Sequence, residues 1–283
     1  MNVVFARPES LVKDSIRSYS DFFDLVELSR YESCYIREID LDRDCIYIIC
    51  PVNAQIRILD EKLARPRKAK LIFWNLERSD SGPYELSKVG SSGASNSTKE
   101  IWNYVDAVWV SDRHYASLHK KLTYVTLGSD PYLAYGQRSE SPSYDIATLT
   151  YNNDRRREVY GPLSRHWKMA PESAWGDDRA RILNSSKCMV YVHQTPIQIG
   201  SPLRFALAAA YKLPLISETM ADPYPLLEDF DVVMCRKEEM VQRVDTWLSE
   251  GWLSELGKNL HQTLCVNLPF KKCVEEGISR SFR

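Results

Sequence analysis

Short runs of β-branched, aromatic and other apolar residues alternate with longer mixed segments, and this alternation limits the fold more than any other feature of the chain. Most of the runs end at Pro, Asn, Asp or Gly, where loops begin. Strands separated by helix-length segments are typical of repeated βα units around a mostly parallel sheet. In the first half the expected strands are Val3–Ala6, Cys45–Cys50, Lys70–Asn75, Ala107–Ser111 and Tyr124–Leu127, and the expected helices are Pro8–Arg30, Gln55–Leu63, Thr98–Asp106 and Arg113–Lys121.

The pattern changes near Leu127–Pro131 and the polar run Gly136–Ser143, and a second α/β series follows. Because 283 residues exceed one ordinary core, we predict two Rossmann-like domains, at 1–135 and 144–250, with closing helices at 251–283. In the second series the expected strands are Asp145–Thr150, Lys187–His193, Leu213–Ser217 and Asp231–Met234, and the expected helices are Asp154–Ser164, Asp177–Ser185, Pro202–Tyr211 and Glu238–Ser249. The Gly- and Ser-rich stretch Ser79–Ser97 is expected to be a loop, either a lid or acceptor loop or a disordered segment.

Composition narrows the functional classes. The 37 basic and 38 acidic residues leave a net charge of −1, whereas a general polyanion-binding protein needs a broad positive field. No stretch approaches the ~20 apolar residues that cross a bilayer, and the amino terminus lacks the features of a secretory leader. We therefore expect a cytoplasmic protein without a membrane span. Seven cysteines without C-x-x-C or zinc spacing favour buried thiols over disulfides or a metal site.

The most informative stretch follows the expected strand Lys187–His193. There Ser201 and Pro202 open an alanine-rich helix, since serine can accept a hydrogen bond from the free amides at a helix start and proline needs no donor there. Those amides and the helix dipole attract anions. Arg204, in the first turn, can add a two-pronged contact to a phosphate. We predict a diphosphate site at Ser201 and Arg204.

Other polar residues follow the expected strands of the second half, at the edge where α/β sheets bind ligands. His193 either contacts a ligand or is a satisfied core histidine. Glu218 either accepts hydrogen bonds from ribose or sugar hydroxyls or is an acid in a surface turn. Arg155, Arg156 and Arg157 either form a solvated helix face or place one or two charges beside donor phosphates.

The second half resembles the carboxyl-terminal domain of GT-B-fold glycosyltransferases, especially bacterial and phage group-one-like enzymes. The resembling stretches are DIATLTYNNDRRREVYGPL, WGDDRARILNSSKCMVYVHQ and SPLRFALAAAYKLPLISE. The resemblance implies two Rossmann-like domains facing across a cleft, a UDP- or GDP-linked sugar bound mainly by the second domain, and catalysis without a metal or other cofactor. It also implies donor contacts from Arg156 or Arg157, His193, Arg204 and Glu218.

In the first half, Phe73–Glu77 resembles the family's strand beside the acceptor, and Val110–His114 resembles the segment before the interdomain crossing. The chain departs from the family where Leu203–Phe205 replaces a helix-starting glutamate, and this leaves retention or inversion open. Glycosyl transfer builds negative charge on the leaving diphosphate, which arginine and helix amides stabilise. An inverting enzyme also needs a base for the acceptor hydroxyl, and Glu77, Asp112 and His114 are the candidates.

Other functional classes are kept as alternatives. Asp40 and Asp42 match the D-x-D pair of metal-dependent transferases of another fold, but a charged turn fits their position between strands. The chain lacks both a glycine-rich dinucleotide turn after Val3–Ala6 and a G-x-S-x-G elbow, which argues against a dehydrogenase and an α/β-hydrolase. The acceptor is unidentified. A nucleic acid acceptor, as in a phage-type enzyme acting on a hydroxymethylated base, and a non-catalytic sugar-nucleotide or nucleic-acid binding protein both stay open.

Overall fold

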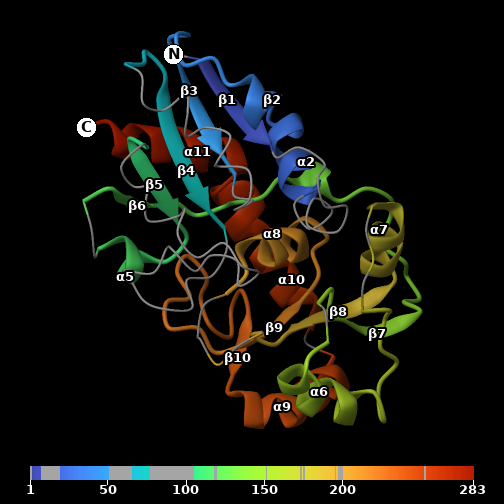
Figure 1. The fold of residues 1–283 in the computed structure, drawn as a ribbon. Helices are drawn as coiled ribbons and strands as arrows, with labels where there is room; N and C mark the ends of the chain where they lie inside the picture. The colour runs from blue at the N-terminus through green and yellow to red at the C-terminus, as the bar shows by residue number, and fades with distance from the viewer. Residues whose placement is uncertain are drawn as a thin grey trace. The chain divides into compact units, whose positions relative to one another are not determined.

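The chain forms two compact units in a computed structural model (Figure 1). The first contains Met1–Leu127 and Lys271–Arg283, and the second contains Gly128–Phe270. The structure describes residues 2–7, 20–50, 66–76, 105–117, 120–150, 152–172, 174, 176–194, 196, 200–251 and 253–283. The expected helix Gln55–Leu63, the loop Ser79–Ser97 and nearly all of the expected helix Thr98–Asp106 lie outside these ranges. The boundary between the two units lies after Leu127, where the sequence pattern also changes.

The first unit is built on a six-stranded parallel sheet with the order β2-β1-β3-β4-β5-β6. Its strands are β1 (Asn2–Arg7), β2 (Glu32–Tyr35), β3 (Cys45–Ile49), β4 (Lys70–Asn75), β5 (Ala107–Val110) and β6 (Leu122–Tyr124). β2 was not expected from the sequence, because its residues Glu-Ser-Cys-Tyr are polar or only partly buried at a sheet edge. The last strand lies two residues before the position predicted for it.

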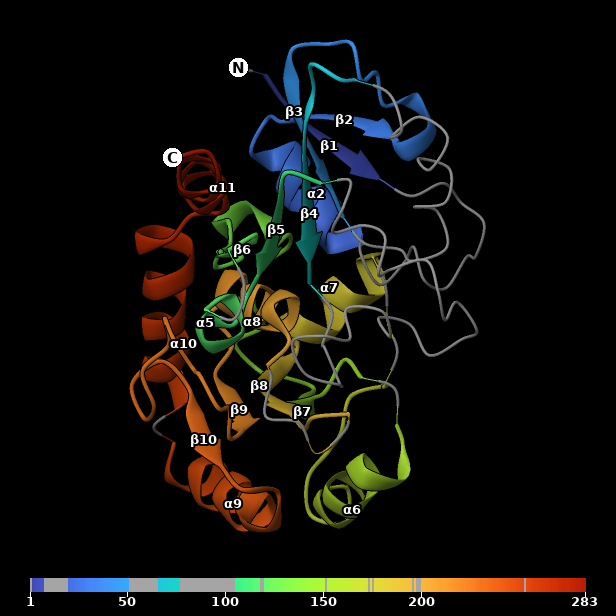
Figure 2. The ribbon, with the colours of Figure 1, turned by 60° about the vertical axis from the view of Figure 1, so that its left-hand side comes forward.

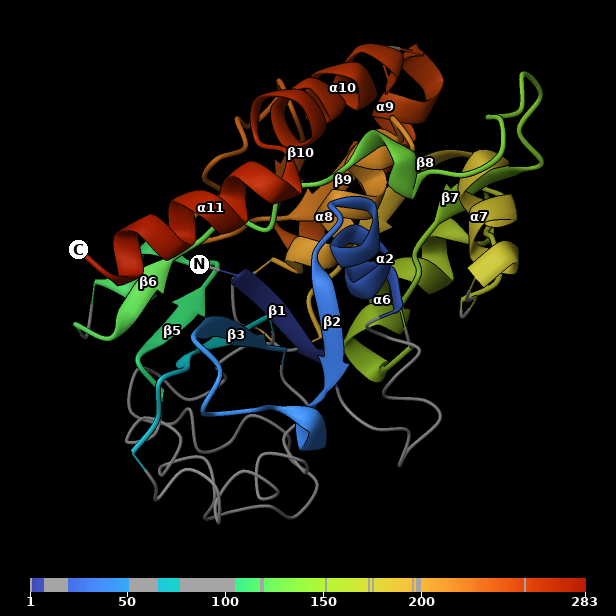
Figure 3. The ribbon, with the colours of Figure 1, turned by 90° about the horizontal axis from the view of Figure 1, so that it is seen from above.

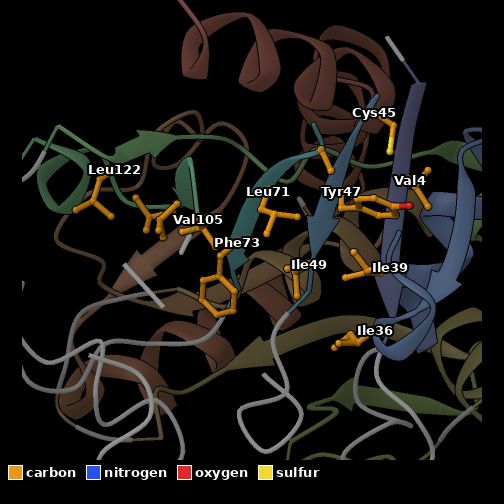
Figure 4. Packing of buried hydrophobic residues seen from close by; sticks show 14 residues of the cluster. Val4, Ile36, Ile39, Cys45, Tyr47, Ile49, Leu71, Phe73, Val105 and Leu122 are labelled. Atoms are coloured by element: carbon orange, nitrogen blue, oxygen red, sulfur yellow. The ribbon is translucent and has the colours of Figure 1, made fainter. Parts of the chain in front are cut away.

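Both faces of this sheet are buried, as a parallel sheet requires. One face carries a cluster that includes Tyr47, Leu71 and Phe73 (Figure 4). On the other face Trp74 meets Phe22 of α2 (Ser20–Leu28) with ring centroids 5.4 Å apart. Figure 3 shows α2 and α11 (Phe270–Ser281) on the same side of this sheet. The Trp109 Nε1–H donates to Ser281 Oγ at 2.8 Å, which ties α11 to the sheet.

The second unit contains a four-stranded parallel sheet with the order β10-β9-β8-β7. Figure 2 shows α6 and α9 on one face of this sheet and α8 on the other, with α10 beside α8. The strands are β7 (Tyr144–Ala147), β8 (Ser186–Tyr191), β9 (Leu215–Glu218) and β10 (Val233–Cys235), and the helices are α6 (Asp154–Leu163), α7 (Gly176–Asn184), α8 (Pro202–Ala210), α9 (Met240–Glu250) and α10 (Leu253–His261). All nine elements overlap the predicted ones, because periodicity and caps marked them in the sequence.

Shorter elements connect these strands and helices. They are the 3-10 turns η1 (Ile36–Glu38), η3 (Pro131–Leu133) and η4 (Lys237–Glu239), the short helix α5 (Arg113–Ala116) and the π-type turn η5 (Gln262–Asn267). The sequence grouped residues 251–283 as one closing segment. In the structure α10 packs in the second unit, whereas 271–283 belongs to the first.

Several polar and cysteine positions also have clear places. All seven cysteines are free thiols, and all but the partly buried Cys34 are buried. Asp40 lies in a turn, where its Oδ1 accepts the Asp42 N–H at 3.0 Å. Among the described residues, no helix is long and apolar enough to span a membrane.

The contact of α10 with the segment before β9 generates a stability prediction. A Cβ at Gly257 would lie 2.2 Å from the Lys212 carbonyl oxygen, which is backbone and cannot rotate away. We expect Gly257→Ala to destabilise the protein by about 2–3 kcal/mol, because overpacking forces the backbone to shift. Gly161→Ala in α6 is the control, since a Cβ there meets nothing within 4 Å and alanine favours a helix by about 1 kcal/mol. The measurement is the midpoint of urea-induced unfolding. Equal midpoints for Gly257→Ala and the parent would contradict the close approach of α10 to the Lys212 carbonyl.

Candidate functional site

The carboxyl ends of β7, β8 and β9 meet at one edge of the second sheet, because neighbouring strands run parallel. Ligands of open α/β sheets bind at this edge. The residues that follow the strands there are Thr148 to Thr150 after β7, Val192 and His193 after β8, and Glu218, the last residue of β9, with Thr219. Helices α6 and α8 begin near the same edge, so their first turns supply further side chains to it.

An ion pair joins the ends of β8 and β9 to the start of α6. Arg155 donates to both oxygens of Glu218, at 2.7 Å for the Nη1–Oε2 contact, and Nη1 also donates to the His193 carbonyl at 3.0 Å. The His193 N–H donates to Glu218 Oε2 at 2.9 Å. Burial opposes ionisation of Glu218, but these hydrogen bonds outweigh it and lower the pKa of its carboxyl group. The bond to Glu218 raises the pKa of Arg155.

Arg156 is buried against the end of β8. Its Nε–H donates to the Val192 carbonyl at 3.0 Å, and its exposed fraction is 4%. Asn153 caps α6 by accepting the Arg156 N–H at 2.9 Å, and its Nδ2 donates to the Gln194 carbonyl. Arg157 lies instead on the outer side of α6, where it pairs with Asp154 at 3.2 Å.

Arg204 connects the start of α8 to the loop after β7. Its Nε and Nη2 donate to the Leu149 carbonyl at 3.2 and 2.9 Å, and its Nη1 donates to Ser201 Oγ at 3.2 Å. Leu149 has φ of 50°, a left-handed backbone that costs a leucine roughly 1 kcal/mol, so the two bonds from Arg204 stabilise an unfavourable turn. The expected Ser201 side-chain cap is wrong, because Ser201 Oγ makes no capping bond to the α8 backbone and accepts from Arg204 instead.

Arg179 is a further arginine at this edge that the sequence argument did not select. It lies in the first turn of α7, is 6% exposed, and donates from Nε to the Ala174 carbonyl at 2.9 Å. Burial, and then the positive charge of Arg204, lower the pKa of Arg179 to about 10. The sequence signal for Arg179 is its position in the first turn of a helix, directly after Asp177 and Asp178.

Neutral groups help to orient these arginines. The hydrogen bonds that place Arg156, Arg179 and Arg204 go to backbone carbonyl oxygens and to a serine hydroxyl. Such bonds fix a guanidinium without neutralising its charge, whereas the carboxylate of Glu218 neutralises Arg155. The edge therefore combines the Arg155–Glu218 ion pair with Arg204, whose described hydrogen bonds go to neutral oxygens, and with two further arginines, an arrangement suited to an anionic ligand.

The two remaining donor-side candidates are buried. His193 is fully buried, its Nε2 lies 3.0 Å from the Thr219 carbonyl oxygen, and its ring meets Tyr191 edge-on at 5.4 Å. Glu218 is 7% exposed, and its carboxylate accepts the three hydrogen bonds described above. The geometry thus favours the core alternative for the His193 ring, and it gives Glu218 a role in holding strand ends together.

The candidate bases belong to the first unit. Asp112 lies two residues after the end of β5 and directly before α5, where its carbonyl oxygen accepts the Ala116 N–H at 3.0 Å. His114 is exposed in the first turn of α5. Glu77 lies outside the described residues. The structure therefore brings Asp112 and His114 to the same strand end and leaves the choice of base as a prediction.

Comparison with known proteins shows the fold. No family model matches the chain, and no curated protein matches its sequence. Among solved structures, HepE of Anabaena in complex with UDP-glucose has a TM-score of 0.63 at 9% identity, with 99% of this chain and 100% of that chain covered. AviGT4, a glycosyltransferase involved in avilamycin A biosynthesis, has a TM-score of 0.59 at 10% identity, covering 99% and 97%. TarM has a TM-score of 0.59 at 9% identity, with 93% of this chain and 58% of TarM covered. The expected GT-B-like α/β fold with two Rossmann-like units is confirmed.

The Arg155–Glu218 pair generates a pH prediction. The pKa of Glu218 is lowered on folding, so its contribution to stability is complete above the ordinary value of 4.5 and is lost as pH falls through the lower folded value. We expect Glu218→Gln to destabilise the protein by about 2–3 kcal/mol at neutral pH, because it leaves the charge of Arg155 without its partner.

The measurement is the melting temperature at neutral pH and at about pH 3. The gap between the parent and Glu218→Gln should narrow at the lower pH. Asp178→Asn removes an exposed ion pair with Arg181 on α7 and serves as the control, with a small effect at both pH values. A gap that stays constant with pH would contradict the ionised role of Glu218.

Proposed function

We propose that the protein is a metal-independent glycosyltransferase that moves a sugar from a UDP- or GDP-linked donor to an acceptor. The observation that carries this proposal is the group of arginines at the carboxyl edge of the second sheet, oriented by carbonyl oxygens in a GT-B-like fold. Similar solved structures support it, since AviGT4 is a glycosyltransferase and HepE was crystallised with UDP-glucose.

The proposed chemistry depends on stabilising the leaving diphosphate. As the bond between the sugar and the diphosphate breaks, positive charge grows on the sugar ring and negative charge grows on the phosphate oxygens. Arg204 and the positive end of the α8 dipole would attract those oxygens, and Arg156 and Arg179 would add positive potential beside them. Because these groups are already fixed by protein contacts, little reorganisation is needed when the charge develops.

The other donor-side residues take different proposed roles. Glu218 acts as a positioning residue, because its carboxylate fixes Arg155 and the His193 backbone. The His193 ring is buried and its backbone N–H and carbonyl oxygen are bonded to Glu218 and Arg155, so His193 would hold the end of β8 in place rather than contact the donor. Arg157 keeps its predicted phosphate role only if its side chain leaves Asp154 on donor binding, an exchange that an exposed pair permits at little cost.

An acceptor hydroxyl must lose a proton during the transfer. In an inverting mechanism a side chain of the first unit takes that proton, and Glu77, Asp112 and His114 are the proposed bases. In a retaining mechanism the leaving diphosphate, held by Arg204, can take the proton itself. No metal is required in either case, because guanidinium charges supply the electrostatic stabilisation.

Donor affinity provides the first prediction for this function. We expect Arg204→Ala to weaken binding of UDP or GDP by about 10- to 100-fold, because a hydrogen bond to a charged group contributes about 1.5–3 kcal/mol. Isothermal titration calorimetry measures the affinity. Arg181→Ala is the matched control, since Arg181 lies in the same unit but pairs with Asp178 in solvent. Unchanged affinity in Arg204→Ala would exclude the phosphate site at α8.

Turnover provides the second prediction. The protein incubated with UDP- and GDP-sugars should slowly release the nucleoside diphosphate, because water replaces the missing acceptor, and a chelator should leave the rate unchanged. Nucleotide release followed by chromatography is the measurement. A strict requirement for manganese would contradict metal independence. Tight donor binding without any release, with or without duplex DNA, would favour the non-catalytic binding protein.

A further inference from the structure

The first unit carries a second arrangement of arginines, at the carboxyl end of β1. Arg7 is the last residue of β1 and Tyr35 is the last residue of β2, and the two are direct neighbours in the parallel register. The guanidinium carbon of Arg7 lies 4.6 Å from the centroid of the Tyr35 ring. Arg37, in the turn that follows, has its guanidinium carbon 5.6 Å from the same ring. One aromatic ring therefore holds two positive charges close together.

The topology places this group at the point where the sheet changes direction. β1 lies between β2 and β3, so the chain leaves β1 toward one edge of the sheet and then returns to the other side of β1. In open parallel sheets the crevice outside the carboxyl ends of the strands at such a point is where ligands bind. In the second unit, the order β10-β9-β8-β7 follows the chain without such a reversal.

The polar atoms of Arg7 are only partly satisfied by the described part of the chain. Its Nε is buried and has no hydrogen-bond partner there. A buried N–H without a partner costs about 1–3 kcal/mol, and more when the group is charged. The stacking on Tyr35 satisfies the face of the guanidinium but not its Nε–H, which an anion bound beside Arg7 would satisfy.

The nearest acids are engaged by other groups. Glu38 Oε2 accepts the Tyr35 N–H at 2.7 Å, which closes the turn that carries Arg37. Glu32, at the other end of β2, forms a two-pronged pair with Arg43 at 2.9 and 3.0 Å. The hydrogen bonds described for these two carboxylates stabilise the turn after β2 and the start of β2.

We propose that Arg7 and Arg37, stacked on Tyr35, bind an anionic group of the acceptor substrate. The chemical class is a phosphate ester or a sugar carboxylate, because both present two oxygens in the plane that a guanidinium recognises. The assignment to the acceptor rests on the proposed transferase function, since the donor diphosphate is assigned to the second unit. The anion site itself depends only on the geometry of the first unit.

The test measures binding of simple anions to the full chain carrying Arg204→Gln, which weakens the proposed donor site. The probes are inorganic phosphate, glycerol phosphate and glucuronate, with glucose as the neutral comparison, and the readout is the dissociation constant from ligand-dependent melting shifts. Adding Arg7→Gln should weaken anion binding about tenfold. Arg43→Gln, a change to another arginine of the same unit, should leave it unchanged.

Each outcome decides the proposal. Phosphate binding sensitive to Arg7→Gln supports a phosphorylated acceptor, and glucuronate binding with the same sensitivity supports an acidic sugar. Absence of anion binding, equal binding in Arg7→Gln, or equal binding of glucose would overturn it. Arg37→Gln, at an exposed position, provides a second variant should Arg7→Gln fail to fold. UDP binding by the parent protein separates the two proposals. If the parent does not bind UDP, the proposed transferase function is contradicted, but the proposed anion site is not.

Discussion

The candidate site depends on the hydrogen bonds that the Glu218 carboxylate accepts. This carboxylate accepts hydrogen bonds from the Arg155 side chain and from the His193 backbone, so it joins the ends of two strands to the start of α6. An ion pair this buried contributes little net stability compared with an apolar contact, but losing one partner is costly. The ion pair matters because it fixes the ends of two strands, and these strand ends position the neighbouring arginines.

The sequence predicted the second unit well because its signals are local. The N-cap at Asn153, the proline at the start of α8 and the apolar strand over 186–191 each mark an element without reference to distant residues. β2 escaped prediction because an edge strand needs few apolar residues. The assignment of α10 and α11 to different units also escaped prediction. It depends on contacts such as the hydrogen bond between Trp109 and Ser281, two residues that lie far apart in the sequence.

The sequence predicted where the candidate residues lie in the fold, but not which groups their side chains contact. The sequence brought Arg155 to Arg157, His193, Arg204 and Glu218 to strand ends and helix starts, and the structure places them there. It could not show that Arg155 neutralises Glu218, that the Arg156 side chain turns inward while Arg157 turns outward, or that Arg179 lies near Arg204. Hydrogen bonds between residues 36 to 63 positions apart decide the roles of Arg155 and Arg156, and single-sequence periodicity carries no information on them.

Both candidate sites use the same physical device. An arginine held by a carboxylate is stable but loses its attraction for an anion, whereas an arginine held by a carbonyl oxygen or an aromatic face is oriented and keeps its charge. Arg204 is held by the Leu149 carbonyl and Arg7 by the Tyr35 ring. The charge of Arg204 lowers the pKa of Arg179, and the buried Arg7 Nε has no hydrogen-bond partner among the described residues, so the anions that we propose would stabilise each arrangement. On these proposals, a protein with a net charge of −1 would bind anions at two defined places without the broad positive field that nonspecific binding to polyanions requires.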